Sequence, residues 1–149
     1  MGAGFLNTNR NKRSIALDLR NPDGRDVVLR LIARGDAVVH NMRPKAAAKL
    51  GLSYEDAKRA NNGIVYCYSP GFGQDGPYAD EPAYDDIIQA MSGLAELNAD
   101  STGAPRFLPS IIADKVVGLH LAFALAAGTV SLLRMGGHPP DTDAVVAEA

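Results

Sequence analysis

Residues 37–68, with the sequence AVVHNMRPKAAAKLGLSYEDAKRANNGIVYCY, contain the two apolar runs that decide the fold. The runs at residues 37–39 and 64–68 have the length and the branched or aromatic composition of buried strands. Between them the chain predicts two short helices, one over residues 45–50 and one that opens at Ser53. Strands separated by helices in this way are typical of a parallel sheet with crossover connections.

The same alternation extends upstream. Residues 13–19 alternate in a strand-like way, and Asn21, Pro22 and Asp23 predict the start of a helix that ends at Gly35. The order becomes strand, helix, strand, two helices, strand. We therefore expect an α/β fold with an open parallel sheet and crossover helices, in which ligands bind beyond the carboxyl ends of the strands.

Downstream, the sequence predicts a long loop over residues 70–82, a helix near 84–96 and an apolar helix from about residue 114. Residues 116–133 form a run without formal charge, and the length of this run is nearly enough to span a bilayer. Because the run contains polar residues and glycines and is bounded by charges, we interpret it as a buried helix of a soluble domain.

Composition limits the function classes. The chain has 149 residues, 46% of them hydrophobic, which fits one domain with a moderate core. A net charge of −2 gives no electrostatic footprint for nucleic acid. A single cysteine, Cys67, excludes an internal disulfide framework, and the first residues lack the apolar segment of a signal peptide. We expect a cytoplasmic protein without nucleic-acid or membrane partners.

The two ends of the sequence predict an incomplete domain. The first predicted strand begins almost at once, and residues 135–149 are polar without a packing pattern. We therefore expect a partial large domain over residues 1–134, followed by a disordered or truncated tail over 135–149.

The glycine run at residues 71–76 matches G-x-G-x-x-G and follows a predicted strand, as in dinucleotide-binding folds. In those folds a helix begins inside the run and its N-terminus holds the pyrophosphate. Here residues 77–82 include two prolines and predict a loop. The three histidines also lack the spacing of metal ligands. The sequence thus favours neither a nicotinamide cofactor nor a metal.

Asp114 opens the long apolar helix and has two interpretations. Its carboxylate can cap the helix by accepting free backbone N–H groups. The same position also suits a carboxylate nucleophile, because a helix N-terminus holds an anion in a fixed orientation. The pattern alone leaves both open.

An ordered set of motifs resembles the class III CoA-transferases, the CaiB/BaiF family. The motifs keep family-like spacing over about residues 5–134, and only the set is specific. They lie at residues 9–15, 17–19, 39–44, 50–54, 64–67, 71–78, 84–85, 89–93 and 113–114, with Gly118. The resemblance implies a Rossmann-like large domain that is incomplete here.

The resemblance also implies roles. Asp114 matches the aspartate that attacks an acyl-CoA in relatives and forms a mixed anhydride. The CoA thiolate then converts the anhydride to an enzyme-CoA thioester, which the acceptor acid breaks down. This is covalent catalysis without a metal, and its substrates are acyl-CoA and a small carboxylic acid. The CoA contacts of relatives map to Leu17, Asp18, Leu19, Arg20, Asn41, Met42, Arg43, Lys49, Pro82, Ala83, Tyr84 and Asp85.

The physical pattern overlaps with these implied contacts. Arg20, Arg43 and Lys49 lie at predicted strand ends or in basic clusters, so they become candidates for phosphate pairing or adenine stacking. Full-length relatives form interlinked homodimers. They also carry an upstream part of the CoA site, a glycine-rich loop and a second domain, none of which this chain matches.

Departures from the family pattern keep alternatives open. Residues 39–45 read V-H-N-M-R-P-K where relatives usually read V-E-N-F-R-P-G. Related 2-methylacyl-CoA racemases resemble this chain but have His where Tyr84 stands, and a phenol is a poor base at neutral pH. Transfer is thus favoured over racemisation. A third interpretation is an inactive fragment that only binds CoA.

Overall fold

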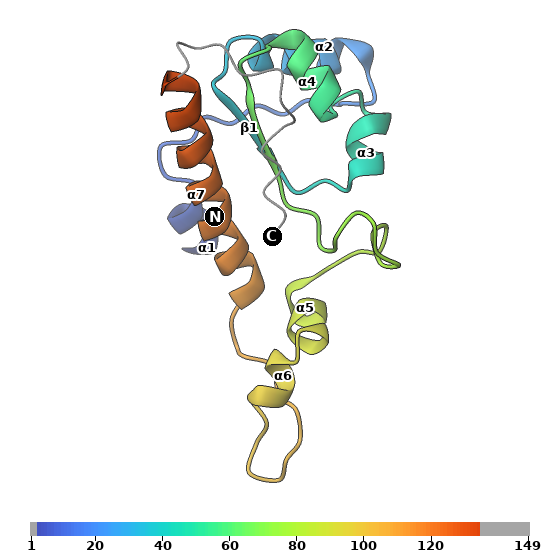
Figure 1. The fold of residues 1–149 in the computed structure, drawn as a ribbon, viewed down its shortest axis with the longest axis vertical. Helices are drawn as coiled ribbons and strands as arrows, with labels where there is room; N and C mark the ends of the chain where they lie inside the picture. Colours follow the sequence, from blue (N-terminus) through green and yellow to red (C-terminus); the bar gives the residue numbers. More distant parts are fainter. Residues whose placement is uncertain (1–2, 135–149) are drawn as a thin grey trace.

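The computed structural model describes residues 3–134, so the predicted tail at 135–149 lies outside the described residues. From residue 37 to residue 68 the elements follow the predicted order of strand, two helices and strand, whereas α1 was not predicted; all elements are drawn in Figure 1. In chain order they are α1 Ala3–Thr8, α2 Pro22–Ile32, β1 Ala37–His40, α3 Pro44–Lys49, α4 Tyr54–Ala60, β2 Val65–Tyr68, α5 Asp85–Met91, α6 Leu94–Leu97 and α7 Ile112–Arg134.

The strands β1 and β2 pair in parallel, which confirms the central prediction. Their register sets Ala37 opposite Val65 and His40 opposite Tyr68. The two strands therefore end side by side, with α3 and α4 forming the connection between them. This α/β arrangement around a small parallel sheet is the fold class that the alternation of elements predicts.

The prediction of a strand at residues 13–19 is wrong. In the described part of the chain the sheet contains β1 and β2 alone, residues 13–18 have no regular secondary structure, and residues 19–20 lie in a turn. Alternation predicts where side chains point but does not supply a ladder partner for the backbone. Ile15 stays 60% exposed, whereas Leu19 packs against the core.

Two helix starts form as predicted because side chains satisfy their free N–H groups. The Asn21 side chain accepts from the Asp23 N–H at 3.0 Å, with Pro22 in the first turn of α2. At α4, Ser53 and Asp56 form a capping box. Such caps typically contribute about 1 kcal/mol each.

The core lies between α2, α4 and β2. Its buried members are Ile32, Leu52, Ala57, Ile64 and Tyr66. It is small, and it is supplemented by the polar side chain of Asn61, whose amide donates to the Gly35 carbonyl at 2.8 Å. That bond ties the end of α4 to the turn after α2.

The single helix expected near residues 84–96 is two helices. Gly93 adopts a positive φ of 78°, a conformation that ends α5 and lets α6 begin in a new direction. The sequence contained this signal as a glycine within an apolar periodic segment.

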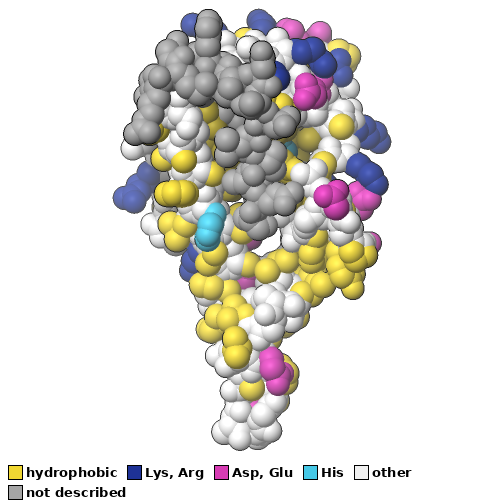
Figure 2. All heavy atoms as spheres, viewed as in Figure 1, with side chains coloured by type: hydrophobic (Ala, Val, Ile, Leu, Met, Phe, Trp, Pro, Cys, Tyr) yellow, Lys and Arg dark blue, Asp and Glu magenta, His cyan; other side chains and the backbone are white. Residues whose placement is uncertain are grey.

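The expected burial of the apolar helix is also wrong for the described residues. Helix α7 packs along β2 and α5 (Figure 1), yet Leu119 is 73% and Phe123 is 75% exposed. Figure 2 shows hydrophobic side chains gathered on this side of the surface. By length and composition α7 could cross a membrane, and none of its most apolar window is buried.

Two glycines of α7 differ in their surroundings and predict opposite mutational effects. A Cβ on Gly118 would meet nothing within 4 Å, whereas a Cβ on Gly128 would lie 2.9 Å from Val65 Cγ1. Gly118→Ala should raise the free energy of unfolding by about 0.5–1 kcal/mol through helix propensity. Gly128→Ala should instead lower it by about 1 kcal/mol, because the helix has to move off β2.

Urea unfolding followed by circular dichroism measures both variants. Equal stabilisation by the two alanines would show that α7 does not depend on close contact with β2.

Candidate functional site

The carboxyl ends of β1 and β2 define one edge of the sheet. His40 and Tyr68 end the two strands opposite each other, and the segments 41–43 and 69–70 leave the sheet there. Figure 1 shows the N-terminal end of α7 beyond this same edge, next to α5. The two regions that sequence reasoning assigned to the site thus lie on one side of the sheet.

Asp85 joins the N-terminal ends of α5 and α7. Its Oδ1 accepts the backbone N–H of Asp114 at 3.1 Å, and the N–H groups of residues 112 and 113 also bond to this carboxylate. Desolvation raises the pKa of Asp85, but the hydrogen bonds from Gln89 and from residues 112–114 outweigh it. The net pKa therefore lies below the usual range.

Gln89 holds the carboxylate of Asp85 from the other side. This amide is 2% exposed, and its Nε2 donates to Asp85 Oδ2 at 2.7 Å and to the Ser110 carbonyl at 3.2 Å. Its Oε1 accepts the Leu108 N–H at 2.8 Å. A buried amide with all of these partners fixes the chain that leads into α7. Sequence reasoning missed this role, although Gln89 lies inside a recognised motif.

Asp114 occupies the first turn of α7, two residues after the helix begins. The interpretation of Asp114 as the N-cap is wrong, because the carboxylate that receives the free N–H groups belongs to Asp85. The Asp114 side chain is exposed and forms no hydrogen bond or ion pair with another described residue. Its carboxylate is therefore available at the positive end of a helix dipole.

Among the predicted CoA contacts, residues 17–20 form a tight turn before α2. Arg20 donates to both carboxylate oxygens of Asp18, at 3.0 and 3.1 Å, and this pairing lowers the pKa of Asp18. Both side chains are exposed, so the pair can exchange for another anion at little cost. Leu19 packs against the same core cluster as Met42.

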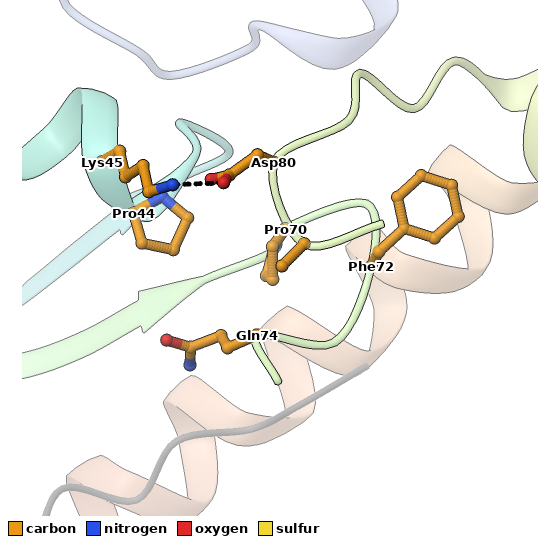
Figure 3. Close-up of a pocket in the computed structure, with 7 residues that line it drawn as sticks. Pro44, Lys45, Pro70, Phe72, Gln74 and Asp80 are labelled. Carbon is orange, nitrogen blue, oxygen red and sulfur yellow. Dashed lines mark hydrogen bonds and ion pairs between the residues drawn. The ribbon is translucent and has the colours of Figure 1, made fainter. Parts of the chain in front are cut away.

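The segment after β1 is held to the loop before α5. Arg43 Nη1 donates to the Asp80 carbonyl at 2.7 Å, and Lys45 forms an ion pair with the Asp80 carboxylate (Figure 3). A pocket of about 170 Å³ opens here. It is smaller than the roughly 300 Å³ or more of typical ligand pockets. Its lining residues are Pro44, Lys45, Pro70, Phe72, Gln74, Ala79 and Asp80.

The segment Pro82, Ala83 and Tyr84 passes directly over the loop that follows β2. A Cβ on Gly71 would lie 2.0 Å from the Ala83 Cβ, so glycine is required there by close approach. Tyr84 is 71% exposed and immediately precedes α5. No helix begins between the glycine run and Asp85, so the loop predicted to follow the run is confirmed.

The predicted residues form two groups in the structure. Asp85 contacts the backbone of Asp114, while Leu19 and Met42 both pack against the core cluster. Lys49, the last residue of α3, is exposed, and no hydrogen bond or ion pair joins it to a described residue. The described residues 3–134 contain no cluster of three or more His, Cys, Asp or Glu side chains suited to a metal.

Comparison with known families identifies the class. The family described as CoA-transferase family III matches residues 1–138, so this chain belongs to CoA-transferase family III. It is 40% identical over 129 residues to the succinate–glutarate CoA-transferase of Agrobacterium fabrum, over 87% of this chain and 32% of that protein. It is 37% identical over 132 residues to the succinyl-CoA:glutarate CoA-transferase of Mus musculus, over 89% of this chain and 30% of that protein.

Solved structures agree with this membership. A CaiB/BaiF family protein from Brucella suis matches with a TM-score of 0.82 and 37% identity, over 88% of this chain and 35% of that one. A hypothetical protein from Mycobacterium tuberculosis matches with a TM-score of 0.81 and 28% identity, over 94% and 40%. The fold class predicted from the sequence is confirmed, and the chain spans about a third of the length of the relatives it matches.

The capping role of Asp85 predicts that substitutions of two neighbouring aspartates, Asp85 and Asp86, differ in their effect on the free energy of unfolding. Asp85→Asn should lower the free energy of unfolding, because the amide is a weaker acceptor and faces the Gln89 donor. Asp86→Asn is the matched control, since Asp86 also lies in the first turn of α5 but makes no hydrogen bond to α7. Hydrogen exchange of the residue 112–114 amides should accelerate only in Asp85→Asn.

The difference in stability between Asp85→Asn and Asp86→Asn should also depend on pH. Because the folded-state pKa of Asp85 is lowered, its stabilisation is present above the unfolded pKa of about 4 and is lost as pH falls. A gap between the two variants that persists unchanged at pH 2.5 would contradict the capping role.

Proposed function

We propose that this chain carries the acyl-accepting carboxylate of an acyl-CoA:carboxylate CoA-transferase, and that Asp114 is this nucleophile. The observation that supports the proposal is an exposed carboxylate, without a partner among residues 3–134, in the first turn of α7 beyond the carboxyl edge of the sheet. Family membership supports the reaction class, and the position of Asp114 supports its proposed role as the nucleophile.

The division of labour between Asp85 and Asp114 favours this assignment. A helix N-terminus needs an acceptor for its free N–H groups, and an aspartate that fills that need is not available for chemistry. Here Asp85 accepts those groups, with Gln89 holding its second oxygen. Neither carboxylate oxygen of Asp114 is used by a hydrogen bond to a described residue, so both remain available for nucleophilic attack.

The proposed reaction proceeds by covalent catalysis. An Asp114 oxygen attacks the thioester carbon, the C–S bond breaks, and CoA leaves as the thiolate while a mixed anhydride forms. The thiolate then attacks the Asp114 carbonyl carbon, which releases the donor acid and leaves CoA as a thioester on the enzyme. The acceptor carboxylate attacks that thioester, and returning thiolate completes the new acyl-CoA and frees Asp114.

The basic residues near the sheet edge suit the phosphates of CoA. Arg20 and Arg43 present guanidinium groups whose present partners are an exposed carboxylate and a backbone carbonyl. Lys49 is exposed on α3. Phosphate would form charge-assisted hydrogen bonds with these groups.

The names of relatives suggest the class of acid. The Agrobacterium fabrum and Mus musculus proteins are named for succinate or succinyl-CoA and glutarate, and a relative from Acetobacter aceti for acetyl-CoA and oxalate. Succinate, glutarate and oxalate are all dicarboxylic acids. We therefore propose a short dicarboxylic acid as donor or acceptor. An exposed tyrosine at position 84 gives no base for racemisation.

Trapping tests the nucleophile. Incubation with succinyl-CoA or acetyl-CoA, followed by hydroxylamine, should leave a hydroxamate that mass spectrometry maps to Asp114. Asp114→Asn should abolish the adduct and lower transfer between acyl-CoA and dicarboxylic acid by at least about 1000-fold. Its affinity for CoA should change little.

Asp86→Asn serves as the matched control and should be trapped like the unchanged protein. An adduct at another residue, together with an active Asp114→Asn variant, would refute the assignment. CoA binding without any adduct would instead support the inactive CoA-binding fragment.

A further inference from the structure

The ring of His40 joins three parts of the fold at the end of β1. Its Nδ1 accepts the backbone N–H of Met42 at 3.0 Å, and its Nε2 lies 2.6 Å from the Tyr66 hydroxyl. That hydroxyl donates in turn to the Leu52 carbonyl at 2.7 Å. The chain of bonds runs from the turn after β1, through β2, to the segment between α3 and α4.

Donor and acceptor rules fix every proton in this chain. A backbone N–H can only donate, so Nδ1 of His40 carries no proton. The one hydroxyl proton of Tyr66 is used toward Leu52, so Nε2 of His40 is the donor to the Tyr66 oxygen. The network therefore requires the neutral imidazole with its proton on Nε2. Protonation would set a second N–H against the Met42 N–H and break that bond.

The surroundings of the ring favour the neutral state. His40 stacks on Tyr68 at a centroid distance of 5.8 Å and meets Tyr66 edge-on at 5.2 Å. Burial lowers the pKa of His40, and no carboxylate among the described residues forms a hydrogen bond or ion pair with it. Burial, Tyr68 and Asp56 together raise the pKa of Tyr66 to about 12, so its hydroxyl remains a donor.

The bond to Met42 shapes the turn that leaves the sheet. It links a side chain at residue 40 to the backbone N–H two residues on, the pattern of an Asx turn. This bond sets the direction of residues 41–43, which family resemblance associates with CoA. Its loss would release a short segment that also carries Arg43 toward Asp80.

We propose that neutral His40 is a positioning residue that holds residues 41–43 in the conformation that binds CoA, so that affinity for CoA falls when the ring is protonated. This inference rests on the proposed function for the identity of the ligand. The positioning itself rests on the hydrogen bonds of His40 with Met42 and Tyr66.

Two substitutions of His40 test the roles of its two ring nitrogens separately. In His40→Asn the side-chain oxygen takes the place of Nδ1 and can still accept the Met42 N–H in an Asx turn. In His40→Gln the amide reaches the place of Nε2, toward Tyr66, and leaves the Met42 N–H without its acceptor. Calorimetric titration with CoA at pH 7.5 should give near-unchanged affinity for His40→Asn and about 10-fold weaker binding for His40→Gln.

The pH profile adds a readout that a merely structural residue would not move. Because burial lowers the pKa of His40, the affinity of the unchanged protein for CoA should fall beyond any fall in His40→Asn only at pH values below the ordinary histidine pKa of about 6.5. His40→Asn still reports ionisation of the CoA phosphate and of the other histidines. Equal pH profiles, or His40→Asn binding as weakly as His40→Gln, would overturn the proposal.

Hydrogen exchange at the Met42 amide, measured without CoA, separates this proposal from the proposed function. The protection factor of this amide, which corrects for the intrinsic pH dependence of exchange, should be high in the unchanged protein and in His40→Asn, and low in His40→Gln and in the unchanged protein in acid. If CoA does not bind at all but this pattern holds, the proposed function fails and the positioning of the turn stands. If Met42 exchanges equally in all variants, the positioning fails even where CoA binds.

Discussion

The parallel ladder between β1 and β2 is the constraint on which the rest of the structure depends. Because parallel strands end on the same edge, pairing His40 with Tyr68 brings the turn after β1 beside the loop after β2. Each turn is then fixed by a short-range contact: residues 41–43 by the ring of His40, and the loop of Gly71 by its approach to Ala83. A four-residue strand pair thus organises two loops that are almost thirty residues apart in sequence.

At the other side of the site, the buried side-chain amide of Gln89 fixes the start of helix α7. The side chain of Gln89 makes its three hydrogen bonds only if Asp85, Leu108 and Ser110 stand where they do, and removing any of them leaves a buried polar group with fewer partners. Asp85 is consequently fixed against the first turn of α7. The free carboxylate of Asp114 is a result of that arrangement rather than of its own contacts.

Local signals in the sequence predicted local structure well. The caps at Asn21 and Ser53 and the strands at β1 and β2 follow from side-chain chemistry within a few residues. Predictions failed where the outcome depends on distant partners. Residues 13–19 alternate but have no strand beside them, and the capping of α7 comes from Asp85, which lies 29 residues away from Asp114 in sequence. Motifs placed Asp85 in the site, while its physical role needed the structure.

Helix α7 determines where Asp114 lies relative to the sheet, because it is anchored at two points. Gly128 fits against Val65 at the start of β2, and the helix runs back along the strand toward Asp85 (Figure 1). From Gly128 to Asp114 the helix rises about 21 Å at about 1.5 Å per residue. From Val65 to the end of β2 the strand advances only about 10 Å at about 3.3 Å per residue. The helix start therefore lies well past the end of the strand, so its length carries Asp114 to the edge where parallel sheets bind ligands.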